Sequence, residues 1–135
     1  MIRSLRRFRG DTKGIGAVEF ALILPLLILL IVGIAQMGIL YFAHSGLRNL
    51  VAEGARFAAI SPRPTDTAIK ARLNQGGFGL VPAQLGQPTV TYGNTGGTPW
   101  ADIKMSYTVQ LSFIFWAPTP FEIEENRRVF LYPAA

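Results

Sequence analysis

One long stretch without charge limits the fold of this chain more than any other feature. No Asp, Glu, Lys or Arg occurs from Phe20 to Leu47, a run of 28 positions in which Gln36 and His44 are the strongly polar residues. A bilayer core about 30 Å thick needs about 20 helical residues at about 1.5 Å each. The sequence therefore predicts a membrane-spanning helix from about Phe20 to Tyr41.

Basic residues precede this stretch. Of the net charge of +5, the first 14 residues carry +4, from Arg3, Arg6, Arg7, Arg9 and Lys13 against Asp11. Positive charge beside a membrane helix stays on the cytoplasmic side, so we expect residues 1–14 to form a cytoplasmic leader and the C-terminal part to lie across the membrane. We attribute the cluster to topology and expect no nucleic-acid ligand. A cleaved secretory signal is the alternative, but its apolar region is only about 7 to 15 residues long.

The helix is expected to continue beyond the membrane. Apolar residues spaced three and four apart follow, with polar residues on the other faces, until Ser61-Pro62 stops the helix. The apolar positions are Leu47, Leu50, Val51, Ala55 and Ala58. We predict one transmembrane and extended helix over 15–60, in which Pro25 removes a backbone hydrogen bond and permits a bend.

Residues 61–135 are predicted to form a small α+β head outside the cytoplasm. A short helix capped by Thr65-Asp66 ends at Gly76-Gly77, and three strands follow, over about 89–92, 103–116 and 121–132. Short connections predict an antiparallel sheet whose apolar face packs on a helix. The chain of 135 residues has no cysteine, so disulfides, thiolate metal sites and cysteine nucleophiles are excluded.

Glu19 is unusual for a plain membrane anchor. A carboxylate at mid-membrane costs about 2.5 to 3.5 kcal/mol and calls for a partner. If the chain were cut after Gly14, Ile15 would carry a free ammonium one helical turn before Glu19. The alternative is that Glu19 only offsets the helix dipole at the cytoplasmic end.

The start of this helix resembles a known family. A basic leader, then Gly14, Glu19, Phe20 and Pro25 in a long apolar helix, is similar to the class-three prepilin signal of tight-adherence (Flp-type) pili. It most resembles the TadE-like minor pseudopilins, whose Gly-Ala-Val-Glu-Phe-Ala-like box begins here at Gly16. The likeness covers about the first 60 residues.

The resemblance implies a function in pilus assembly. It implies that prepilin peptidase cuts between Gly14 and Ile15, leaving 121 residues (135 − 14) with Glu19 as the fifth; a cut after Gly16 is the alternative register. It further implies that Glu19, Phe20 and Pro25 are assembly residues, with Glu19 pairing with a subunit's terminal amine. The implied partners are prepilin peptidase, other pilin-like subunits, the inner-membrane assembly platform and membrane lipids, with no cofactor. The protein would cross the bacterial inner membrane once, with a periplasmic head, and could then enter an extracellular pilus.

Other chemistry has weaker support in the sequence. His44 is the only histidine and lies at the membrane boundary, where an interfacial polar residue is the better interpretation. The acids Asp102, Glu122, Glu124 and Glu125 could form a calcium or acid–base site, but neighbouring arginines favour a solvated charged strand end. We therefore expect no enzyme. The alternative function is an uncleaved, membrane-tethered module that binds an envelope ligand.

Overall fold

The computed structural model describes residues 14–113 and 116–132, with the backbone alone at 113 and 116. A single long helix begins this part of the chain. Helix α2 spans Ile15–Ala58, 44 residues, and runs through Pro25 without interruption. The predicted long N-terminal helix is confirmed, and it ends at Ala58, two residues before the expected end at 60. Ser61 precedes Pro62 and is therefore driven out of the α region.

The chain divides into two compact units, residues 1–35 and residues 36–135. In the first unit, the described part is helical, and large apolar side chains such as Leu22, Leu26 and Ile31 are exposed on it. Among the residues described, α2 is the one helix long and apolar enough to cross a membrane. It fits a single-pass membrane anchor.

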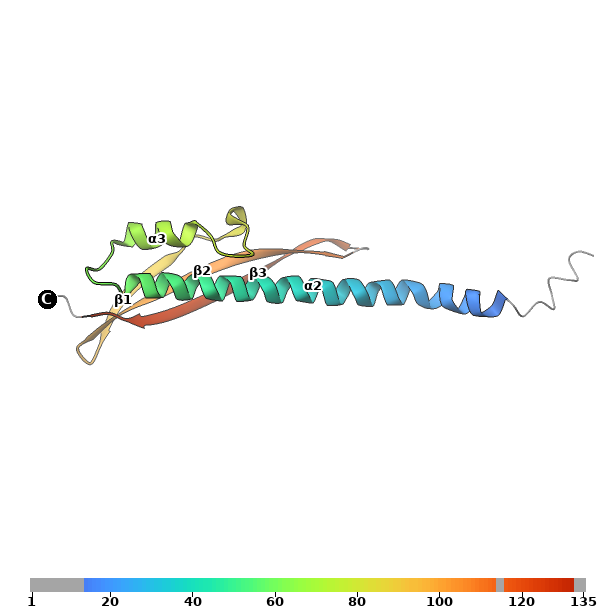
Figure 1. Ribbon diagram of the computed structural model, residues 1–135, viewed down its shortest axis with the longest axis horizontal. Coiled ribbons are helices and arrows are strands. Elements are labelled where there is room, and N and C mark those ends of the chain that lie inside the picture. The colour runs from blue at the N-terminus through green and yellow to red at the C-terminus, as the bar shows by residue number, and fades with distance from the viewer. Residues whose placement is uncertain (1–13, 114–115, 133–135) are drawn as a thin grey trace, which may run out of the picture. The chain divides into compact units, whose positions relative to one another are not determined.

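The second unit, which we call the head unit, combines the C-terminal part of α2 with a short helix and a sheet (Figure 1). Its further elements are α3 (Asp66–Asn74), the 3₁₀ helix η2 (Pro82–Gln84), β1 (Thr89–Thr95), β2 (Thr98–Phe113) and β3 (Trp116–Phe130). The strands form one antiparallel sheet in the order β1-β2-β3, with Val90 opposite Ile103 and Tyr107 opposite Ile123. The predicted α+β fold with a three-stranded antiparallel sheet is confirmed.

The strand boundaries differ from those expected. β1 continues to Thr95, and the chain turns at Gly96 and Gly97, whose φ angles of 59° and 84° suit the tight hairpin that the twist of the strands requires. The predicted break between Ala117 and Pro120 is wrong, because β3 runs through both prolines from Trp116. β3 is an edge strand, where the missing N–H of proline need not leave a neighbouring strand unpaired.

The core of the head unit lies between α2, α3 and one face of the sheet. The predicted alternation in β2 is confirmed for the described side chains, because Ile103, Met105, Tyr107 and Val109 are all buried. The predicted inward positions Phe113 and Phe115 lie outside the described side chains. From the helices, the core receives Ala43, Leu47, Leu50, Val51, Ala55, Ala58, Ile69 and Leu73. The amphipathic pattern thus identified the helix face that carries the sheet.

Candidate functional site

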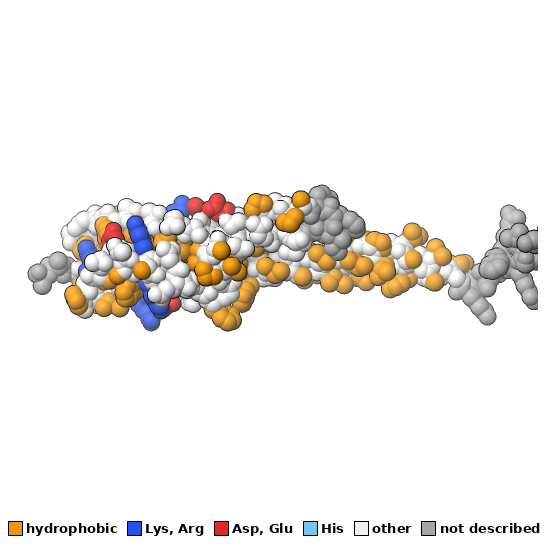
Figure 2. Space-filling view, turned by 90° about the horizontal axis from the view of Figure 1, so that it is seen from above, with side chains coloured by type: hydrophobic (Ala, Val, Ile, Leu, Met, Phe, Trp, Pro, Cys, Tyr) orange, Lys and Arg blue, Asp and Glu red, His pale blue; other side chains and the backbone are white. Residues whose placement is uncertain are grey.

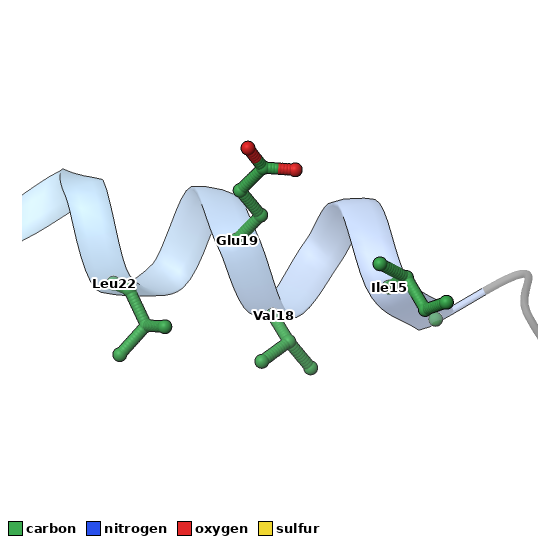
Figure 3. Close-up of a pocket in the computed structure, with 5 residues that line it drawn as sticks. Ile15, Val18, Glu19 and Leu22 are labelled. Carbon is green, nitrogen blue, oxygen red and sulfur yellow. The ribbon is translucent and has the colours of Figure 1, made fainter.

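Glu19 lies near the start of α2, on a helix surface that is otherwise apolar. Gly14, Ile15, Val18, Glu19 and Leu22 line an open concavity there (Figure 3). The Glu19 carboxylate points to one side of the helix in Figure 3, and Val18 and Leu22 point to the other. The carboxylate therefore lies at one edge of a concavity whose other side chains are apolar.

The helix geometry brings Ile15 and Glu19 together. They are four positions apart in α2, so they lie on the same face with a rise of about 6 Å between them. Phe20 follows Glu19 by one position and is rotated away from it by about 100° around the helix axis, and it is largely exposed. Pro25 lies in the helix interior, more than one turn further along.

The carboxylate of Glu19 has no charged partner among residues 14–113 and 116–132, whose ion pairs all lie in the head unit. It is also the only Asp, Glu, Lys or Arg from position 14 to position 47. An ionised carboxylate placed in a bilayer core costs about 2.5 to 3.5 kcal/mol.

A comparison with family models matches residues 14–56 to the family described as TadE-like protein. This segment is TadE-like. The match begins at Gly14 and covers nearly all of α2, and it leaves α3 and the sheet outside. Comparisons with curated proteins and with solved structures gave no match.

The TadE-like segment supports a membrane component associated with the tight-adherence pilus. The family match and the apolar run that could cross a membrane fall on the same element, α2.

Outside the TadE-like segment, the acidic residues of the sheet do not converge. Asp102 pairs with Arg128 at 2.6 Å, and Lys104 pairs with Glu124 at 2.8 Å across the β2–β3 ladder. The hydrogen bond from Arg128 holds the pKa of Asp102 below its usual value. In the part of the chain that the structure describes, no three metal-ligating side chains gather. The interpretation as a charged strand fits these cross-strand pairs.

His44 and Ser45 also remain separate from any catalytic arrangement. Both lie exposed on α2, and adjacent helical residues point in different directions. No hydrogen bond joins them within the described residues. The helix position of His44 at the end of the apolar run accords with an interfacial residue.

One polar contact of the head unit was not predicted from the sequence. The Tyr92 hydroxyl donates to Asp66 at 2.6 Å, and the Arg63 guanidinium lies 5.3 Å from the centre of the Tyr92 ring. Burial, then the hydrogen bond to Asp66, raises the pKa of Tyr92 to about 12. The contact joins β1 to the start of α3. Residues 26 positions apart carry no sequence signal that pairs them.

Proposed function

We propose that the chain is a minor pseudopilin of a tight-adherence pilus, made with a cytoplasmic leader over 1–14 that prepilin peptidase removes after Gly14. The observation that carries the proposal is the TadE-like match over residues 14–56, which begins at the proposed cleavage residue and contains Glu19. Glycine supports cleavage there because it lets the backbone fit closely into a peptidase site.

Processing supplies the partner that Glu19 needs. Cleavage creates an ammonium at Ile15, which could meet its own Glu19 one turn away or the Glu19 of a neighbouring subunit. In an assembly the second pairing joins two chains, because the Ile15 ammonium of one subunit can form an ion pair with the Glu19 carboxylate of the next subunit. A buried pair of this kind sets register between helices more than it adds net affinity, so Glu19 selects the packing position of the subunit.

The apolar faces of α2 would form the rest of the subunit contact. Within the bilayer, replacing lipid contacts by contacts with another helix brings little hydrophobic gain. Association of the helices therefore depends on close packing at small residues. Gly33 and Gly38 leave open space around their Cα atoms, with nothing within 4 Å of an added Cβ. Phe20 and Pro25 would shape the same surface. The remaining residues, 61–135, would form most of the periplasmic head of a protein that crosses the inner membrane once.

Substitution of Gly14 tests the processing step. Gly14→Leu places a bulky side chain at the proposed cleavage residue and should leave the precursor intact in cells with active prepilin peptidase. Gly10→Leu makes the same change within the leader and should be processed normally. The readout is intact mass of the membrane-extracted chain, and a processed Gly14→Leu protein would overturn the cleavage assignment.

Substitution of Glu19 tests the assembly step separately. Glu19→Ala should leave membrane insertion unchanged and reduce co-purification with other pilin-like subunits. Glu53→Ala is the matched control, because Glu53 is a carboxylate on the same helix that pairs with Arg72 inside the head unit. Equal co-purification of the two variants would remove the proposed role of Glu19.

A further inference from the structure

One end of the head unit is free of charge although it is built from three separate segments. No Asp, Glu, Lys or Arg occurs in residues 36–47 of α2, in residues 73–88 after the middle of α3, or in residues 105–121 around the β2–β3 turn. Contacts hold the segments together. Phe42 packs edge-on against Phe78 at 5.7 Å between ring centres, and Tyr107 forms a bridge with Leu85.

The end of β2 is fixed to α2 at the same place. The side-chain amide of Gln36 donates from Nε2 to the carbonyl oxygen of Ser112. The Oε1 atom of Gln36 is buried and has no hydrogen-bond partner among the described residues. The contact places the far end of the sheet beside the segment of α2 that continues the apolar run.

Large apolar side chains are exposed on this end of the head unit. We call them the apolar base, and they are Met37, Ile39, Tyr41, Phe42, Phe78, Val81 and Phe121. Phe78 is the clearest member, with 82% of its surface exposed although it sits in a turn next to the core. On the face drawn in Figure 2, the coloured side chains in the right part of the head are orange, and the blue and red ones lie further left, where orange ones also occur.

Local backbone features hold Phe78 outward. Gly79 has φ of +77°, and an added Cβ would collide with the Phe42 ring. The Tyr107 hydroxyl accepts from the Val81 amide at 3.3 Å and donates to Gln84 at 2.8 Å, which fixes the segment after the turn. The exposure of Phe78 is therefore built into the fold, because the turn has anchors on both sides.

We propose that the apolar base rests in the outer boundary layer of the bilayer that α2 spans, with lipid as its partner. Each boundary layer is about 5 to 7 Å thick, and α2 rises about 9 Å from Gln36 to Phe42. The base thus occupies the depth at which the helix leaves the hydrocarbon. Aromatic side chains such as Tyr41 are favoured there, and an uncharged apolar surface gains by entering the acyl boundary.

This inference depends on membrane anchoring by α2 and not on cleavage after Gly14 or on pilus assembly. A second copy of the chain or another subunit is the competing occupant of the apolar base. Lipid is favoured because the surface is continuous with the apolar run of α2 and because the charged residues lie elsewhere on the head unit. The two occupants give different results in the experiment below.

The absence of cysteine allows single reporters to measure depth. The full, unprocessed chain is reconstituted at one copy per lipid nanodisc, with Phe78→Cys or Phe121→Cys labelled by an environment-sensitive fluorophore. Phe130→Cys is the matched control, because Phe130 lies in the same strand as Phe121 and is similarly exposed, 61% against 47%. All three side chains are exposed, so the core is unchanged. If Phe78→Cys fails to fold, Val81→Cys replaces it.

Lipids with a nitroxide near the headgroup should quench the labels at 78 and 121 and leave the label at 130 unquenched. The two emission spectra should also shift to shorter wavelength relative to the control. Equal quenching at 121 and 130 would overturn the proposal. Shielding of 78 and 121 that requires two copies per disc, without lipid quenching at one copy, would overturn it in favour of a protein interface.

Discussion

The contact between Gly54 on α2 and Leu73 on α3 allows a quantitative test of how the two helices pack. Both residues are buried, and Leu73 is fully so. A Cβ added at Gly54 would lie 2.5 Å from Cδ2 of Leu73 and 3.1 Å from Cγ. Since a carbon pair prefers about 3.5 to 4.0 Å, Gly54→Ala must displace the Leu73 side chain.

The expected free energies follow from this clash. Gly54→Ala gains about 1 kcal/mol of helix propensity and loses about 1 to 3 kcal/mol by overpacking, so it should be neutral or destabilising. Leu73→Ala should cost about 2 to 5 kcal/mol because it leaves a cavity. In that background the colliding atoms are absent, and Gly54→Ala should stabilise the head by about 1 kcal/mol.

The double-mutant cycle should therefore show coupling of about 1 to 3 kcal/mol with a favourable sign. The assay is urea unfolding of the full chain in detergent micelles, followed by intrinsic tryptophan fluorescence. Gly38→Ala is the control, because nothing lies within 4 Å of its added Cβ, and it should not couple to Leu73→Ala. Additivity within about 0.5 kcal/mol would refute the packing of α3 on α2 at Gly54.

Three further predictions concern the head unit. The Tyr92 phenol should titrate at about 12, measured by phenolate absorbance. The stability that the protonated phenol contributes is therefore complete below about pH 10 and is lost as pH rises through 12. Asp66→Asn should lower the titration midpoint of Tyr92, and an unchanged midpoint would contradict the hydrogen bond. Asp102, whose pKa is lowered by Arg128, contributes stability above its ordinary value of 3.8 that is lost as pH falls through the folded value. Asp102→Asn should therefore lower Tm at neutral pH and have no effect in strong acid, and a constant difference between the two would count against the pair. Gly79→Ala should cost about 1 to 2 kcal/mol because of its positive φ, together with the Phe42 contact, and an unchanged Tm would show that the turn is not fixed as described.

The long helix and its packed face could be predicted from sequence because each depends on local pattern. The charge-free run from Phe20 determines α2 without reference to other residues, and spacings of three and four from Leu47 onward identify the buried face. Strict alternation from Ile103 predicts the central strand for the same reason. These features lie in single segments whose period is visible along the chain.

The remaining features depend on partners far away in sequence. Pro118 and Pro120 predict a break on local grounds, but proline is acceptable in β3 because that strand lies at the edge of the sheet. The order of the strands cannot be predicted from local pattern. The hydrogen bond from Tyr92 to Asp66 cannot be predicted from local pattern either, because the two residues are 26 positions apart. For the candidate site, the sequence predicts Gly14, Ile15 and Glu19, and these stay predictions. The apolar base around Phe78 could not be predicted, because its residues come from three uncharged segments that only the fold brings together.

The central claim is that proteolysis creates the ammonium that Glu19 meets. The most direct test is N-terminal sequencing, with intact mass, of the chain extracted from membranes of its host with active prepilin peptidase. The account predicts a mature protein of 121 residues that starts at Ile15 (135 − 14). A protein that still starts at Met1 would contradict it and favour an uncleaved anchor.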